Sequence, residues 1–160
     1  PFADNYFDLI TSATAVHWFQ FDQFFSEIRR VGKNNSIVAC WAYKVFRTDQ
    51  ETINKLVDRF YNETIHDYWD SERRHVDEEY KNIPVPFREV RNPGFATQLS
   101  WDLQTLEGYL NTWSAVQHFI QKNKVNPVNQ LMEEIRHEVG ADDNILMTFP
   151  IFMRMGIISK

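Results

Sequence analysis

A run of small side chains near the start of the chain ends in a histidine, a pattern that could bind a ligand and move a proton. The small residues are Thr11, Ser12, Ala13 and Ala15, and His17 follows them. Small side chains let a ligand approach the backbone closely, and a histidine can act as a general base when its pKa lies near 7. The alternative is a turn packed beneath a helix, with a histidine that serves only the local structure.

Further aromatic, basic and hydroxyl side chains could line a pocket for a small molecule. An arginine can hold a carboxylate through paired hydrogen bonds, and aromatic rings supply apolar walls. With aromatics at 15% of the chain, the alternative for any single ring is packing in the core. The candidates are Trp18, Trp69, Arg73, Tyr80, Trp113 and Ser114.

Composition argues against several classes of function. The net charge of −5 and the mixed charges around Arg73 and Arg74 leave no basic stripe for a nucleic-acid backbone. The five histidines show no metal-binding spacing such as H-E-x-x-H, so we predict no metal site. No apolar run is long enough to span a membrane, and no signal peptide is visible. The one cysteine, Cys40, has apolar neighbours and predicts a buried thiol in a cytoplasmic protein.

The elements that must position these residues begin with a strand, a helix and a second strand. The apolar run FDLITSA from Phe7 predicts a strand buried on both faces. Asp22 is the expected N-cap of a helix whose apolar residues recur up to Val31. A second apolar strand is expected from Ser36, and such a unit makes a parallel strand pair. The sequence therefore predicts an α/β fold.

The middle of the chain predicts a helix, an irregular insertion and another strand. The pattern T-x-x-E from Thr48 to Glu51 is a capping box for a helix that runs to about His66. The stretch DYWDSERRHVDEEYKNIPVPF has no clean period and reads as a helical turn and loop stopped by prolines. GFATQLSWDL alternates apolar residues and predicts a strand.

Helices and one more strand are expected in the last third. TLEGYLNTWSAVQHFIQKN predicts two helical pieces, with Thr112 able to cap the second. Asn126 and Pro127 should start a helix that Gly140 ends. ILMTFPIFMRMGIISK predicts a strand or hairpin, with Pro150 placing its middle at an edge or bulge.

Several of these segments resemble the class I S-adenosylmethionine-dependent methyltransferases, in particular the small-molecule branch that includes trans-aconitate methyltransferases. The segments are PFADNYFDLI, AVHWF, EIRRV, IVACWAY, GYLNTWSAVQ and RMG. The resemblance implies the C-terminal half of a Rossmann-like fold, with parallel strands, a last antiparallel strand and a helical insertion. Where the family has a Leu-Lys-Pro-Gly-Gly-type turn, this chain reads GKNNS, and Asn34 or Asn35 can adopt the left-handed conformation there.

The glycine-rich loop that binds the cofactor in this family has no counterpart here. The five glycines are scattered, with no two within ten residues of each other. The resemblance therefore implies that residues 1–160 are the C-terminal portion of one methyltransferase domain, and that the cofactor-binding N-terminal half precedes Pro1.

The resemblance also implies a reaction and roles for the candidate residues. The complete protein would transfer a methyl group from S-adenosylmethionine to a small-molecule acceptor. The backbone from Thr11 to Ala15 would lie beside the methionine part of the cofactor. We favour a carboxylate acceptor, which is ionised at neutral pH and needs no base, so that His17 has a positioning role. A hydroxyl or amine acceptor would make His17 the candidate base.

Two other classes of function stay open at this point. One is a non-catalytic interaction module that retains half of the methyltransferase fold, and the other is a different α/β enzyme whose cofactor half lies elsewhere. Because the resemblance places a further strand beside it in the complete fold, the strand from Phe7 to Ser12 would have one bare apolar edge in this chain alone. We expect self-association through this edge, or its covering by another segment.

Overall fold

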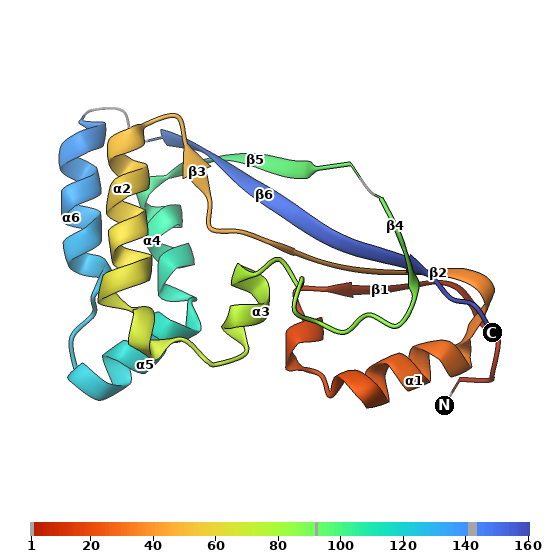
Figure 1. The fold of residues 1–160 in the computed structure, drawn as a ribbon. Helices are drawn as coiled ribbons and strands as arrows, with labels where there is room; N and C mark the ends of the chain where they lie inside the picture. Colours follow the sequence, from red (N-terminus) through yellow and green to blue (C-terminus); the bar gives the residue numbers. More distant parts are fainter. Residues whose placement is uncertain (1, 92, 141–143) are drawn as a thin grey trace. The chain divides into compact units, whose positions relative to one another are not determined.

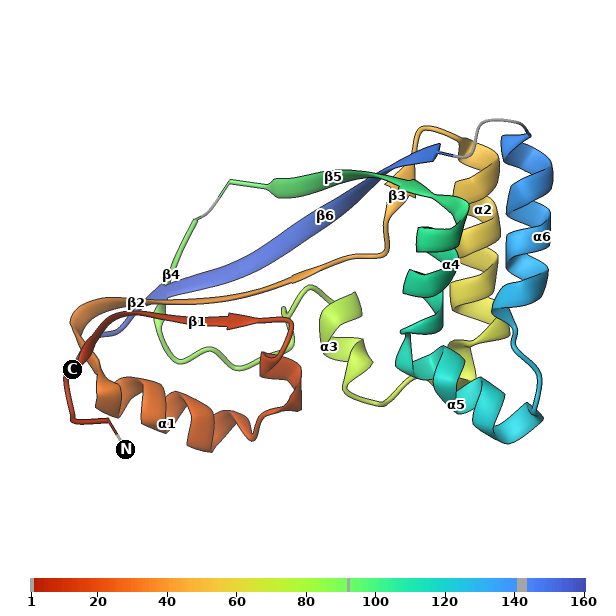
Figure 2. The same ribbon diagram turned by 180° about the vertical axis from the view of Figure 1, so that it is seen from behind.

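The computed structural model describes residues 2–91, 93–140 and 144–160, which divide into two compact units. Unit 1 comprises residues 1–45, 72–96 and 150–160, and unit 2 comprises residues 46–71 and 97–149. Each unit is built from segments that are distant in the sequence, and strand β6 (Asn144–Ile157) contributes residues to both. Figures 1 and 2 show the chain from opposite sides. None of the helices in the described ranges is both long and apolar enough to cross a bilayer.

Unit 1 is an α/β layer in which strands β1 (Phe7–Ala13) and β2 (Gly32–Tyr43) lie parallel, as predicted. β2 also pairs in antiparallel fashion with the second half of β6, from Ile37 opposite Ile157 to Tyr43 opposite Ile151. The short strand β4 (Arg88–Val90) pairs with the same half of β6 and was not predicted. The result is a mixed sheet with a last antiparallel strand.

Helix α1 (Phe21–Val31) packs its apolar face on this sheet and, in Figures 1 and 2, runs alongside β1. The segment from helix α3 (Arg73–Asp77) to Phe87 supplies further side chains to the same core. This core buries Phe25, Ile28, Val38, Cys40, Ala42, Val76, Tyr80, Ile83, Phe87 and Ile158, among others. Cys40 is buried as predicted, and burial raises the pKa of its thiol to about 11.

Unit 2 is mainly helical. Its helices α2 (Glu51–Arg59), α4 (Leu103–Asn111) and α6 (Val128–Val139) run side by side in Figures 1 and 2. A π-helical turn from Phe60 to Thr64 and a 3-10 turn from His66 to Tyr68 follow α2, and α5 (Ser114–Asn123) follows α4. Strands β3 (Arg47–Thr48) and β5 (Phe95–Asp102), which starts in unit 1, pair with β6.

The starts of three helices differ from the predicted caps. α1 begins at Phe21 after Gln20, so Asp22 lies in the first turn. Thr48 is part of β3 and bonds to Asn54, so the predicted capping box does not form. The Thr112 hydroxyl donates to the Tyr109 carbonyl at 2.6 Å and ends α4 instead of starting α5.

Other terminal signals were predicted correctly or nearly so. The Asn126 side chain accepts from the Val128 N–H at 2.9 Å and so caps α6. The helix begins at Val128, one residue later than expected. Gly140 ends α6 with a φ of +68°, and Asn35 takes the left-handed conformation with a φ of +66°. The sequence missed Asp102, whose carboxylate accepts from the Thr105 N–H at 2.6 Å and caps α4.

One prediction about strands was wrong. β1 is not buried on both faces, because Leu9 is 57% exposed and β1 pairs only with β2 among the described residues. An apolar groove of about 440 Å³, lined by residues that include Phe7, Leu9 and Phe24, lies beside it. Of the two forms predicted for the last segment, β6 is a strand and not a hairpin, with Pro150 in its middle. Pro150 lies between Thr148, which pairs with β3, and Ile151, which pairs with β2.

Two glycines should respond to alanine in opposite directions. A Cβ at Gly32 would lie 2.6 Å from Ile158 Cδ1 and 2.9 Å from the Ile28 carbonyl oxygen, so Gly32→Ala should destabilise the fold by about 1–3 kcal/mol. A Cβ at Gly108, inside α4, would meet nothing within 4 Å, so Gly108→Ala should stabilise by about 0.5–1 kcal/mol. Urea unfolding of both variants checks this, and a neutral Gly32→Ala would contradict the packing described here.

Candidate functional site

The carboxyl end of β1 brings together several predicted site residues of unit 1. A 3-10 turn from Val16 to Trp18 follows the strand and buries His17, which is 7% exposed. Its Nδ1 lies 3.0 Å from the hydroxyl oxygen of Tyr80, which is 1% exposed. Both residues were predicted from the sequence as site residues, but nothing in the sequence indicated that they form a hydrogen-bonded pair.

The surroundings of this pair favour its uncharged state. The pKa of His17 is lowered below its ordinary value, first by burial and then by electrostatic interaction with Arg73 and His75, whereas Glu72 has a smaller opposing effect. Burial, followed by proximity to Cys40, raises the pKa of the Tyr80 hydroxyl above its ordinary value. A neutral imidazole and a neutral phenol therefore share the hydrogen bond near pH 7.

Trp18 and Arg73 lie around the pair with more solvent contact. The Trp18 ring is 5.1 Å from that of His17, measured between centroids, and the side chain is 55% exposed. Arg73 is half-buried in α3 and its Nε lies 3.3 Å from Asp77 Oδ1. An exposed ring and a cationic side chain next to a buried polar pair could receive a small anionic molecule.

The four small residues at the carboxyl end of β1 and just beyond it differ in their exposure. Thr11 and Ala13 are exposed, Ala15 is half-buried, and Ser12 is buried. The Ser12 hydroxyl has no hydrogen-bond partner within the described ranges. A buried hydroxyl without a partner is costly, and a polar ligand group at this place would satisfy it.

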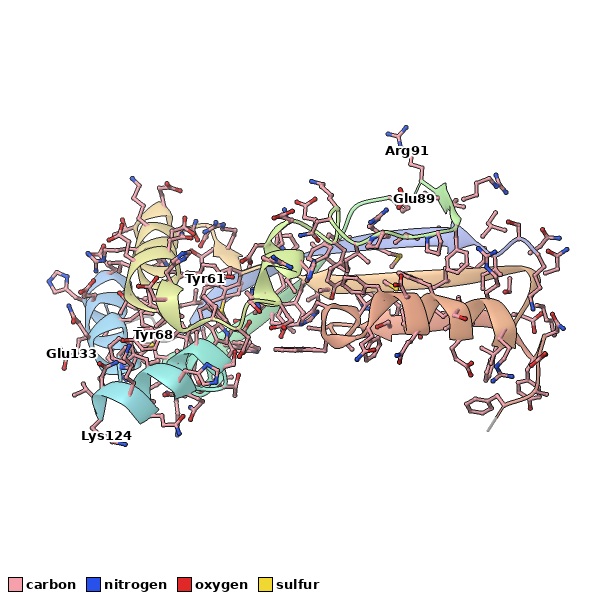
Figure 3. All side chains as sticks on the ribbon, turned by 60° about the horizontal axis from the view of Figure 1, so that its bottom comes forward. Tyr61, Tyr68, Glu89, Arg91, Lys124 and Glu133 are labelled. Carbon is pink, nitrogen blue, oxygen red and sulfur yellow. The ribbon has the colours of Figure 1, made fainter. Side chains whose placement is uncertain are left out.

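The remaining predicted site residues lie in unit 2, within a cluster of aromatic rings. Trp113 and Trp69 lie 5.7 Å apart between centroids, and Tyr61 contacts both rings, at 5.1 Å from Trp69 and 5.9 Å from Trp113. Figure 3 labels Tyr61 on the turn that ends α2. Trp113 is buried and Ser114 is half-buried at the start of α5. This packing is what a core of rings requires, and it leaves the role of Trp113 as a pocket wall untested.

No group of three or more His, Cys, Asp or Glu side chains that could hold a metal ion occurs in the part of the chain that the structure describes. His75, which the sequence did not single out, is buried, and its Nδ1 lies 2.6 Å from Asn82 Oδ1.

Comparisons with known proteins agree on one kind of enzyme. Residues 1–40, which span β1, α1 and most of β2, match the family model of a methyltransferase domain. A candidate methyltransferase of Dictyostelium discoideum is 29% identical over 159 residues, which are 96% of this chain and 59% of that protein. The solved structure of a candidate type II methyltransferase from Anaeromyxobacter dehalogenans is 31% identical, with a TM-score of 0.89. That alignment covers 98% of this chain and 66% of the other.

These matches support a class I S-adenosylmethionine-dependent methyltransferase. The α/β fold, with its mixed sheet and helices, is the Rossmann-like fold of such a methyltransferase. The chain spans less than two thirds of the length of each of these two proteins.

The lowered pKa of His17 predicts a pH-dependent loss of stability. The unfolded chain takes up a proton near the ordinary histidine pKa of about 6.5, whereas the folded protein resists protonation of His17. The contribution of neutral His17 to the free energy of unfolding is therefore complete above the histidine pKa of the unfolded chain. This contribution is lost as the pH falls from that pKa toward the lower pKa of His17 in the folded protein. Urea unfolding at pH 7.5 and 5.5 should show a smaller loss on acidification in His17→Gln than in the wild type. His66→Gln, at an exposed position, is the control. An equal loss in wild type and His17→Gln would contradict this account.

Proposed function

We propose that the complete protein transfers a methyl group from S-adenosylmethionine to a small-molecule carboxylate, in the manner of the trans-aconitate methyltransferase branch. The single observation that carries the reaction class is the similarity to the Anaeromyxobacter structure, which extends over 98% of this chain at a TM-score of 0.89. The cationic side chain of Arg73, which lies close enough to His17 to help lower its pKa, supports an anionic acceptor.

Residues 1–160 would form the C-terminal portion of one methyltransferase domain, with the glycine-rich cofactor loop in another part of the complete protein. The scattered glycines of this chain support this division, because a phosphate- or ribose-binding loop of the usual kind needs glycines close together. A cytoplasmic location is part of the proposal and is supported by the single, buried Cys40.

The end of β1 suits one side of the cofactor. The buried Ser12 hydroxyl lacks a partner among the residues that the structure describes, and the small side chains of Thr11, Ala13 and Ala15 leave the backbone open to close approach. When bound, S-adenosylmethionine supplies an activated methyl group. Thr11 to Ala15 would hold the methionine part of the cofactor.

The side chains around His17 would hold the acceptor. Arg73 would pair with a carboxylate, and the exposed Trp18 ring would cover the acceptor's apolar part. His17, fixed by Tyr80, would donate or accept a hydrogen bond without taking up a proton, because a carboxylate is already ionised. The chain's contribution to rate is then alignment and exclusion of water.

For unit 2 we propose a separate wall of acceptor-binding residues formed by Trp69, Trp113 and Ser114. The support is the close packing of the two indole rings and the half-buried position of Ser114 beside them. Rigid rings of this kind can fix the orientation of a small molecule.

The exposed outer edge of β1 would also be covered in the complete protein, by a second copy or by another segment of the chain. The support is the solvent exposure of Leu9 on a strand that pairs on only one side among the described residues. We propose no nucleic-acid or membrane partner.

Methyl transfer and its pH dependence test the proposal together. The complete protein, supplied with methyl-labelled S-adenosylmethionine and panels of small carboxylates, alcohols and amines, should label the carboxylates. The rate should be flat between pH 6.5 and 8.5, and His17→Gln should lose less than about tenfold, because no proton has to be removed. A rate that rises through a pKa near 7, and loses this rise in His17→Gln, would favour a hydroxyl or amine acceptor. No labelling of any panel would contradict the reaction class.

A further inference from the structure

The backbone that carries Tyr80 has an unusual conformation. Glu79 and Tyr80 both have left-handed backbone angles, with φ values of +57° and +59°. Residues other than glycine rarely adopt this conformation, and two in succession persist only where the surroundings hold them. We call residues 79–80 the left-handed turn. It is this turn that directs the Tyr80 hydroxyl to within 3.0 Å of His17 Nδ1.

One guanidinium group holds the carbonyls that follow this turn. Arg154 Nη1 donates to the carbonyl oxygens of Tyr80 at 2.7 Å and of Ile83 at 2.6 Å. Its Nε donates to Glu89 Oε1 at 2.6 Å, and its Nη2 bonds to the same oxygen. Figure 3 labels Glu89 on β4. The arginine side chain is largely buried, whereas that of Glu89 is half exposed.

The strand that supplies Arg154 also packs on the Tyr80 ring. Phe152 lies two residues before Arg154 in β6, so the two side chains share one face of the strand. The Phe152 ring meets the Tyr80 ring edge-on at 4.9 Å between centroids. Arg154 therefore fixes the backbone of Tyr80 while Phe152 fixes its ring.

Contacts on the other side of the turn are more exposed. Glu79 forms ion pairs with Lys44 and with Lys81, the latter at 2.8 Å. The Tyr80 N–H donates to the His75 carbonyl at 2.7 Å. Exposed ion pairs contribute little, whereas buried charge-assisted bonds to carbonyls contribute more, so Arg154 is the stronger restraint.

We infer that Arg154 is a positioning residue, whose planar guanidinium holds the left-handed turn and thereby places the Tyr80 hydroxyl against His17. Its effect on turnover rests on the proposed function, but its effect on the Tyr80–His17 pair does not. Arginine suits this role better than lysine because its fixed fork can bind two carbonyls and a carboxylate at once.

The test is Arg154→Met in the complete protein, with the imidazole of His17 followed by NMR. The His17 signal is assigned by its absence in His17→Gln. Freed from Arg154, Tyr80 should move away and admit water to His17, whose pKa should then rise toward its ordinary value. The charged and titratable groups that also face His17 are Arg73, His75 and Glu72, and all three are unchanged in this variant. Because Arg154 acts through His17, turnover should fall no further than in His17→Gln, by less than about tenfold.

Two further variants separate positioning from general stability and from charge. Glu89→Ala removes the contact with β4 but leaves the Arg154 bonds to Tyr80 and Ile83, so the His17 titration should stay at its wild-type position. Arg154→Lys keeps the charge but loses the fork, so the His17 titration should move in the same direction as in Arg154→Met. It also serves as the test if Arg154→Met does not fold.

The inference is overturned if the His17 titration is unchanged in folded Arg154→Met, or if only Arg154→Met shifts it while Arg154→Lys does not. It is also overturned if Glu89→Ala shifts the titration as much as Arg154→Met. Absence of methyl transfer in the wild type would contradict the proposed function and leave the NMR result to decide the role of Arg154.

Discussion

The hydrogen bond between His17 and Tyr80 is the interaction on which the candidate site depends. It joins the turn after β1 to the segment after α3, two parts of unit 1 that are more than sixty residues apart in the sequence. A buried polar pair of this kind must be complete, because either group alone would be left without a partner in an apolar environment. The pair therefore needs both a rigid strand on the His17 side and a fixed backbone on the Tyr80 side. The parallel pairing of β1 with β2 supplies the first, and the bonds from Arg154 supply the second.

The strands and helices could be predicted from the sequence wherever apolar residues recur in a long regular pattern. The β1–α1–β2 unit, the helices of unit 2 and the last strand all follow from such periods. The caps were less predictable, because Thr48 and Thr112 had other partners within reach of their hydroxyls. β4 was missed because three residues, two of them charged, carry no period. The apolar composition of β1 predicts burial on both faces, whereas its exposure depends on which strands pair with it.

The candidate site was predictable residue by residue but not as an arrangement. The types of His17, Tyr80 and Arg73 mark them as polar or cationic groups near apolar runs, but only the fold brings His17 and Tyr80 to 3.0 Å. Arg154 could have been noticed as the one charged residue in the apolar stretch ILMTFPIFMRMGII. A buried charge in a strand almost always has a partner, and that partner was not visible from the sequence. In the same way, Trp69 and Trp113 were each named as candidates, and the structure adds that their rings pack together.

The nature of the product tests the central claim most directly. A methyl ester of a carboxylate is split by mild alkali and releases labelled methanol, whereas a methyl ether or methylamine is stable under the same conditions. We predict that the product formed by the complete protein from methyl-labelled S-adenosylmethionine loses its label as volatile methanol after brief treatment with base. A product that keeps its label would contradict a carboxylate acceptor and would make His17 the candidate base for a hydroxyl or amine acceptor.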